Sequence, residues 1–182
     1  TVCDMREGIL EQTAKYQIGG KPGMQPQFHL FVLKSIVAHC ETSEDGRILT
    51  VADLVKFFDK ERLAGAVVTV SNAVDNKALR LWGKLNSRTT IKVRTGVGVT
   101  EEGEAGEVPG QGSCGGGIVS ARYIDSIVDY YFNDSTSEDA YGGVRLQPLI
   151  FLDDLMRSTS SVDDTNSGNM RLNLAIKEMC LQ

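Results

Sequence analysis

Acidic residues stand at the ends of two short apolar segments, and this placement constrains the fold more than any other feature of the chain. Asp53 closes the segment 47–53, and Asp153 and Asp154 directly follow the apolar run 149–152. A carboxylate at the tip of a buried strand is costly unless it is paired or bound to a metal ion. Two such strands lying side by side would bring the three carboxylates together.

Carboxylates gathered in this way suit Mg2+, which is commonly held by one or two carboxylates together with substrate phosphates. Two such ions promote an in-line phosphoryl displacement by activating the attacking hydroxyl and stabilising the leaving group. For Asp153 and Asp154 taken alone, an ordinary turn is the alternative, because Asp is frequent in turns.

Apolar spacing predicts helices at 4–17, 27–40, 118–132 and 163–181, and Asp residues at N-cap positions predict helices at 59–72 and 75–86. Alternation predicts a half-exposed strand at 89–95, and 145–152 with 155–158 is typical of a hairpin whose turn holds Asp153 and Asp154. The stretch 96–117 contains too many glycines for regular structure. These elements indicate an α+β fold, with a mainly antiparallel sheet packed on helices.

Two helices show a clear apolar face. In 27–40 that face consists of Phe28, Phe31, Val32, Ser35, Ile36 and His39, and in 118–132 the inward residues are Ile124, Ile127, Val128 and Tyr131.

The composition of the chain limits the range of possible functions. A net charge of -5 argues against a free-standing nucleic-acid binder, because neutralising phosphates requires Lys and Arg. The four cysteines are widely separated, which indicates neither a zinc site nor a disulfide framework and favours a reducing intracellular setting, the nucleus or the cytoplasm. No apolar run approaches the roughly 18 residues that a membrane helix needs, so we expect no membrane partner.

Three segments resemble the sequence motifs of reverse transcriptases. Residues 52–59 (Ala-Asp-Leu-Val-Lys-Phe-Phe-Asp) resemble motif A, residues 110–113 (Gly-Gln-Gly-Ser) resemble motif B, and residues 151–154 (Phe-Leu-Asp-Asp) resemble motif C. Their order and separations match as well. The flanks 20–23, 81–82 and 145–149 resemble polymerases of non-LTR retrotransposons, and 168–181 resembles the helix of motif D.

The resemblance implies a polymerase palm, with part of the fingers at 1–46 and the palm, from motif A to the start of motif D, at 47–182. Asp53 and Asp153 would bind two Mg2+ ions, for which Mn2+ would substitute. The carbonyl of Leu54 would be a further ligand, and Asp154 would help to position the metals.

The same resemblance implies a nucleotide site. Phe58 would lie beneath the sugar and exclude a 2'-hydroxyl, while Gln111 and Gly112 would line the pocket. The reaction would be attack of a DNA primer 3'-hydroxyl on the α-phosphate of a deoxynucleoside triphosphate, directed by an RNA template. Lys92 and Arg94 alternate outward on 89–95 and would contact nucleic-acid phosphates. A strand face that simply lies in solvent explains them at least as well.

The chain departs from the family pattern in a few places. Phe57 stands where many relatives have a small residue, and Gly110 replaces the Pro that usually precedes the motif B Gln. No upstream motif supplies basic residues for the triphosphate, and no thumb follows. We therefore expect a fragment of a larger polymerase that is weakly active or inactive alone, with the missing basic parts explaining its acidity.

Three other functions remain open. An RNA-dependent RNA polymerase shares the palm but tends to carry an Asp at the position of Phe58. A decayed palm would serve as a binding or scaffold module. An unrelated metal-dependent phosphotransferase or nucleotidyl cyclase would need neither Phe58 nor the segment 111–113.

Overall fold

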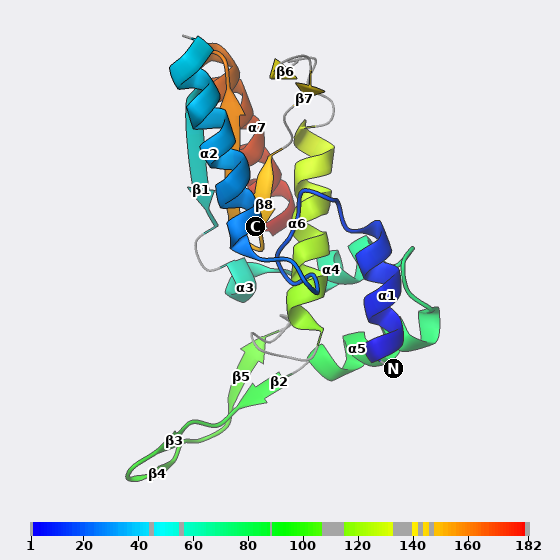
Figure 1. The fold of residues 1–182 in the computed structure, drawn as a ribbon. Helices are drawn as coiled ribbons and strands as arrows, with labels where there is room; N and C mark the ends of the chain where they lie inside the picture. Colours follow the sequence, from blue (N-terminus) through cyan, green and yellow to red (C-terminus); the bar gives the residue numbers. More distant parts are fainter. Residues whose placement is uncertain are drawn as a thin grey trace.

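A three-stranded antiparallel sheet forms the centre of the fold (Figure 1). The structure, a computed structural model, describes residues 2–43, 46–54, 57–87, 89–106, 115–132, 140–141, 144–145 and 148–180. The strand order is β1 (Ile48–Asp53), β9 (Asp154–Thr159), β8 (Leu149–Phe151). Residues 16–18 extend the sheet by a parallel bridge between Gln17 and Ile150. The expected α+β fold with an antiparallel sheet is confirmed.

Most of the remaining described residues are helical. The helices are α1 (Val2–Gln12), α2 (Pro26–Ser43), α3 (Phe57–Lys60), α4 (Leu63–Val70), α5 (Asn76–Asn86), α6 (Gly116–Phe132) and α7 (Val162–Cys180). Helix α2 lies on one face of the sheet, and α6 and α7 lie on the other (Figure 1). Among the described residues, no helix is both long and apolar enough to cross a bilayer.

The two faces of the sheet differ in chemistry because side chains alternate along each strand. One face, the core face, includes Ala52, Leu155 and Ile150, which pack on α6 and α7. The opposite face, here called the aspartate face, consists of Leu49, Val51, Asp53, Leu149, Phe151, Asp154, Met156 and Ser158. Burial of the core face fixes the register, because a slip of one residue would expose it.

A second apolar cluster joins α1, α4, α5 and the start of α6, and it includes Ile9, Val70, Trp82 and Val119. Helices α4 and α6 approach closely at Gly65, where an added Cβ would lie 2.8 Å from the ring of Tyr123. Helix α6 contributes to both clusters, so it connects the sheet to α1, α4 and α5.

A narrow arm, residues 89–106, projects away from the helices (Figure 1). It is built from β2 (Thr89–Ile91), β3 (Arg94–Thr95), β4 (Gly98–Val99) and β5 (Gly103–Gly106), with β2 paired to β5 and β3 to β4. The prediction that 96–117 lacks regular structure is therefore wrong for 98–99 and 103–106, because backbone pairing across the arm needs no side chains. It is also wrong for 116–117, which form the start of α6. A further short pair is β6 (Ala140–Tyr141) with β7 (Val144–Arg145).

Several expected elements are confirmed and others are corrected. The helix expected at 4–17 is α1, which ends at Gln12. Asp75 is the N-cap of α5, and its Oδ2 accepts hydrogen bonds from the amides of Lys77 (2.9 Å) and Ala78 (3.3 Å). The helix expected at 59–72 is instead two helices, α3 and α4. Asp59 lies inside α3, and Arg62 occupies the N-cap of α4 without a side-chain cap.

The expected apolar face of α2 is also wrong in part. Ile36 is buried, but Phe28 and Phe31 are exposed, because the helix packs on the sheet through Val32, Leu33 and Ile36. On α6, by contrast, Ile124, Ile127 and Val128 point inward as expected. The side chain of Tyr131 lies outside the part that the structure describes, and the division expected at residue 46 stays a prediction.

Candidate metal and nucleotide site

The sheet register brings the acidic residues of distant segments together. Asp53, the last residue of β1, is the direct cross-strand partner of Asp154, the first residue of β9. Directly opposed residues of an antiparallel pair project from the same face with their Cβ atoms about 5 Å apart. Both side chains are exposed, so the aspartate face ends in two adjacent carboxylates.

Asp153 precedes this pair in the turn between β8 and β9. Since Phe151 pairs with Asp154, the turn consists of Leu152 and Asp153. The sequence placed Asp154 in the turn, whereas the structure makes it the first residue of a strand. Leu152 has a φ of 56°, the one positive φ among the described non-glycine residues. A positive φ at the first central position only is the pattern of a type II′ turn.

This arrangement fits a divalent cation. Two like charges directly opposed on a sheet repel each other, and a cation between them removes that repulsion. Among the described residues, no group of three or more His, Cys, Asp or Glu side chains is close enough to hold a metal ion alone. Mg2+ does not need such a cage, because it retains several waters and is bound through one or two carboxylates plus substrate phosphates.

Residues expected to contact the nucleotide follow β1. The carbonyl of Leu54 accepts a hydrogen bond from the amide of Phe57 (3.1 Å), which leaves its second lone pair for another partner. Phe58 is partly buried and meets Phe57 edge-on, with ring centroids 5.6 Å apart. Phe57, in turn, is buried against Tyr123, so it fills the core rather than the site. Gln111 and Gly112 lie outside the described residues.

A groove of about 500 Å³ opens beside the aspartates, between the first half of α2 and the aspartate face. Its walls are mainly apolar and include Leu30, Val51 and Phe151, and Asp154 contributes a carboxylate. Concave, mostly apolar sites with a few polar groups are typical of small-molecule binding. The groove therefore places a binding surface next to the carboxylate pair.

Gln17 lies near the candidate site, although the sequence alone does not single it out. Gln17 is fully buried, and its Oε1 accepts hydrogen bonds from the amides of Gly19 (2.9 Å) and Leu152 (3.1 Å). Its Nε2 donates to the carbonyl of Leu152 (3.3 Å). A buried Gln is uncommon, but nothing in the sequence shows that its partner is the turn before Asp153.

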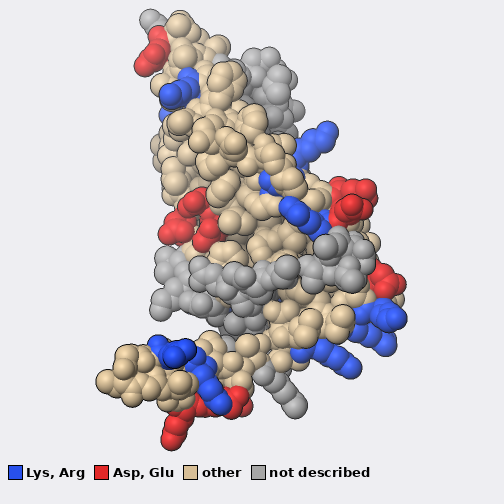
Figure 2. All heavy atoms as spheres, turned by 60° about the horizontal axis from the view of Figure 1, so that its bottom comes forward, with Lys and Arg blue, Asp and Glu red and all other residues tan. Residues whose placement is uncertain are grey.

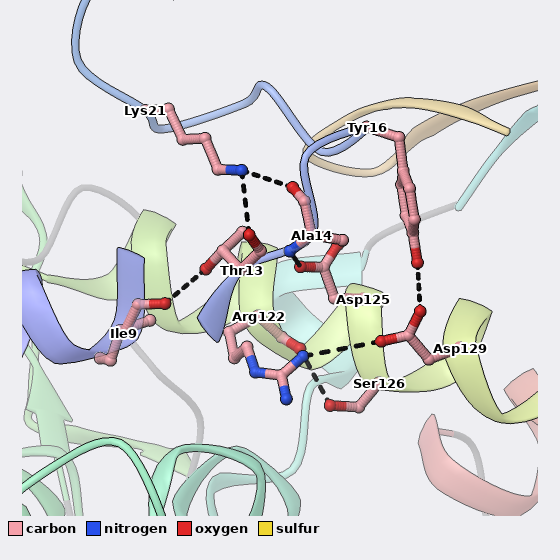
Figure 3. A network of polar contacts seen from close by, with 9 residues as sticks. All are labelled: Ile9, Thr13, Ala14, Tyr16, Lys21, Arg122, Asp125, Ser126 and Asp129. Atoms are coloured by element: carbon pink, nitrogen blue, oxygen red, sulfur yellow. Dashed lines mark hydrogen bonds and ion pairs between the residues drawn. The ribbon is translucent and has the colours of Figure 1, made fainter. Parts of the chain in front are cut away.

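The segment 13–21, which carries Gln17, is fixed to α6 by a polar network (Figure 3). Asp125 accepts a hydrogen bond from the amide of Ala14 (2.6 Å), and the hydroxyl of Tyr16 donates to Asp129. Lys21 donates to the carbonyls of Thr13 (3.2 Å) and Ala14. Burial raises the pKa of Asp125 to about 7, with the amide of Ala14 opposing the rise. Burial and Asp129 also raise the pKa of Tyr16, so its hydroxyl stays a donor.

The arm places its charges far from the aspartates. Lys92 forms an exposed ion pair with Glu102 (3.4 Å), and Arg94 is exposed in β3. Basic and acidic side chains share the arm, which extends at the lower left of Figure 2. The structure therefore separates Lys92 and Arg94 from the candidate metal site, and their expected contact with nucleic acid stays a prediction.

Comparison with known proteins supports the fold and not more. No protein-family model matches the sequence, and no curated protein matches it. Among solved structures, the chain is similar to an apo telomerase from Candida tropicalis, truncated from its C-terminal domain, with a TM-score of 0.69 at 13% sequence identity. The similarity covers 99% of this chain and 38% of that one. The chain thus has a fold similar to that of part of this telomerase, and it spans well under half the length of that structure.

Proposed function

We propose that this chain is the palm core of an RNA-directed DNA polymerase, in which Asp53, Asp153 and Asp154 hold two Mg2+ ions. The observation that carries the proposal is the pairing of Asp53 with Asp154 at the end of the aspartate face, with Asp153 in the adjoining turn. The motifs around these residues resemble those of reverse transcriptases, and the fold is similar to that of a telomerase.

The chain's own residues would divide the work of nucleotidyl transfer. The carboxylates would hold the ions, and the carbonyl of Leu54 would be a further ligand. When bound, the two ions would activate the primer 3'-hydroxyl and stabilise the departing pyrophosphate. Phe58 would lie against the deoxyribose, where an additional 2'-hydroxyl would clash with its ring. Gln111 and Gly112 would line the same pocket.

The partners follow from this reaction. They would be an RNA template, a DNA primer and deoxynucleoside triphosphates, with the polymerase being of the non-LTR retrotransposon type indicated by the flanking motifs. Because the chain spans 38% of the similar telomerase structure, the parts that grip the template and primer would belong to other segments of a longer protein. The dispersed cysteines favour a reducing compartment inside the cell.

A Mn2+ titration tests the proposal, with binding followed by the relaxation of water protons. We expect saturable binding by the wild-type chain that Asp53→Ala and Asp153→Ala both weaken by at least about tenfold. Asp163→Ala is the matched control, because Asp163 is an exposed acid in the first turn of α7, away from the aspartate pair.

Each outcome is informative. Binding that the two site variants weaken and the control does not would support one shared metal site. Tight binding untouched by either variant would move the metal elsewhere and reject the site. An absence of binding would favour a non-catalytic scaffold over a polymerase.

A further inference from the structure

The turn before Asp153 is held in a conformation that its sequence does not favour. Leucine has a Cβ that crowds the backbone at positive φ, so this conformation is disfavoured relative to a negative φ. Leu152 nevertheless has a φ of 56°. Such a conformation persists only where the surrounding structure specifies it.

Gln17 supplies that specification. Its side-chain amide bonds both backbone groups of Leu152, accepting from the N–H and donating to the C=O. The two contacts fix the orientation of the peptide groups on either side of the Leu152 Cα. Because the side chain is fully buried, water does not compete for these bonds.

Gly19 brings the segment 13–21 close enough for this contact. A Cβ at Gly19 would lie 2.3 Å from the Leu152 nitrogen and 2.7 Å from its Cγ, which no side chain tolerates. The Gly19 amide also donates to Gln17 Oε1 (2.9 Å), which orients the side-chain amide toward the turn.

The segment itself is anchored on two sides. The amide of Ile18 donates to the carbonyl of Ile150 (3.0 Å), and the amide of Ile150 donates to the carbonyl of Tyr16 (3.2 Å). On the other side, Asp125 and Asp129 of α6 bind Ala14 and Tyr16 (Figure 3). The backbone around Gln17 is therefore held in place independently of the turn. We infer that Gln17 determines the conformation of Leu152, rather than Leu152 determining that of Gln17.

We propose that Gln17 is a positioning residue for the metal site, which sets the Leu152–Asp153 turn so that Asp153 lies beside the Asp53–Asp154 pair. Its consequence for catalysis rests on the proposed function, but its effect on the turn does not. A turn released from Gln17 relaxes Leu152 toward negative φ and rotates the following peptide, which moves Asp153 away from its partners.

The test compares Gln17→Met, which keeps the size and shape of the side chain and removes its hydrogen bonds, with the wild-type chain of 182 residues. We measure Mn2+ affinity by water-proton relaxation and the exchange rate of the Leu152 amide by NMR. We expect Mn2+ affinity to fall about tenfold to a hundredfold, as for other residues that orient metal ligands. The Leu152 amide should exchange faster, because its acceptor is gone.

Gln12→Met is the matched control. Gln12 lies on α1, and its Nε2 donates to the carbonyl of Asn72 (3.2 Å), so it also makes a bond from side chain to backbone, but far from the turn. This variant should bind Mn2+ as the wild type does.

Rescue separates positioning from a general loss of stability. In the double variant Gln17→Met, Leu152→Gly, residue 152 adopts positive φ without cost, so a large part of the lost Mn2+ affinity should return. A merely structural role for Gln17 predicts no such recovery. Should Gln17→Met not fold, Gln17→Leu takes its place, since it also removes both hydrogen bonds to Leu152 and is read by the same two measurements.

Failure of the two proposals can be distinguished. If the wild-type chain binds no Mn2+, the proposed function fails, and the exchange rate of the Leu152 amide alone decides whether Gln17 sets the turn. If the wild type binds Mn2+ and the Gln17 variant binds it equally well, or if the Leu152 amide exchanges alike in both, the inference about Gln17 is rejected.

Discussion

Phe58 is the single residue from which the choice of sugar is expected to follow. Its ring is partly buried against Phe57, which itself is locked in the core, so the ring has a firm support. We predict that Phe58→Ala raises the use of ribonucleotides relative to deoxyribonucleotides by at least about tenfold, because the clash with a 2'-hydroxyl disappears. Primer extension by the longer polymerase proposed above, with each nucleotide type, measures this ratio, and an unchanged ratio would remove Phe58 from the proposed nucleotide site.

Two buried carboxyl groups away from the candidate metal site give a prediction about the pH dependence of stability. Burial raises the pKa of Asp125 to about 7, against the amide of Ala14, and burial raises that of Glu61 to about 7, against a hydrogen bond from Ser120. Since the native state holds these protons more tightly than the unfolded chain, the stability that they contribute is full below about pH 4. It is lost as the pH rises to about 7.

Asp125→Asn and Glu61→Gln should therefore flatten the pH dependence of the free energy of unfolding in this range. Each group contributes at most about 1.4 kcal/mol per pH unit to the slope. Urea unfolding at several pH values measures the effect, and a slope identical to that of the wild type in both variants would contradict it. Asp75→Asn is a suitable comparison, because Asp75 is an exposed helix cap.

At the level of single residues, the sequence predicts the three aspartates of the candidate site but not the contact that fixes the turn before Asp153. Asp53 and Asp154 lie at the ends of strands, which is a local signal, and the antiparallel pairing brings them together as expected. The contact of Gln17 with Leu152 spans 135 positions in the chain, and it involves backbone groups, which every residue has. No pattern of residue types marks such a contact.

At the level of the helices, two glycines differ in how closely other atoms approach them. At Gly65 of α4 a Cβ would lie 2.8 Å from the Tyr123 ring, whereas at Gly83 of α5 the nearest atom, Val67 Cγ2, is 3.8 Å away. We predict that Gly65→Ala destabilises the chain by about 1–3 kcal/mol through overpacking. Gly83→Ala should instead be neutral or stabilise it by up to about 1 kcal/mol, because alanine favours the helix. Chemical denaturation of both variants decides, and equal effects would contradict the close crossing of α4 and α6.

The helices that the sequence predicts best are those with strong local signals. Helix α5 has its Asp75 cap, and α6 has a regular apolar face. The expected helix at 59–72 is divided because residues 61–62 separate α3 from α4, and the buried side chain of Glu61 turns inward to Ser120. Helix α2 has more apolar residues than can pack on the sheet, so Phe28 and Phe31 remain exposed. Tertiary packing, rather than periodicity, decides which face is buried.

For the molecule as a whole, the distribution of charge bears on nucleic acid. The net charge is -5, and on the arm Lys92 is already paired with Glu102. If the arm contacts a nucleic-acid backbone, Arg94→Ala should lower the slope of log K against log salt by about 1, whereas Lys92→Ala should change it less, since Lys92 must first leave its partner. Binding of an RNA–DNA duplex by the longer polymerase proposed above, at several salt concentrations, measures both slopes. Identical slopes in the wild type and Arg94→Ala would place the arm outside the interface.

Helix α6 takes part in both apolar clusters, with Ile118 and Val119 in one and Tyr123 to Val128 in the other. Two separate cores in one chain would ordinarily melt independently. Here α6 packs in both clusters, so neither cluster can unfold while the other stays folded. Heating should accordingly produce a single cooperative transition, in which the sheet and the helices α1, α4 and α5 lose their structure together.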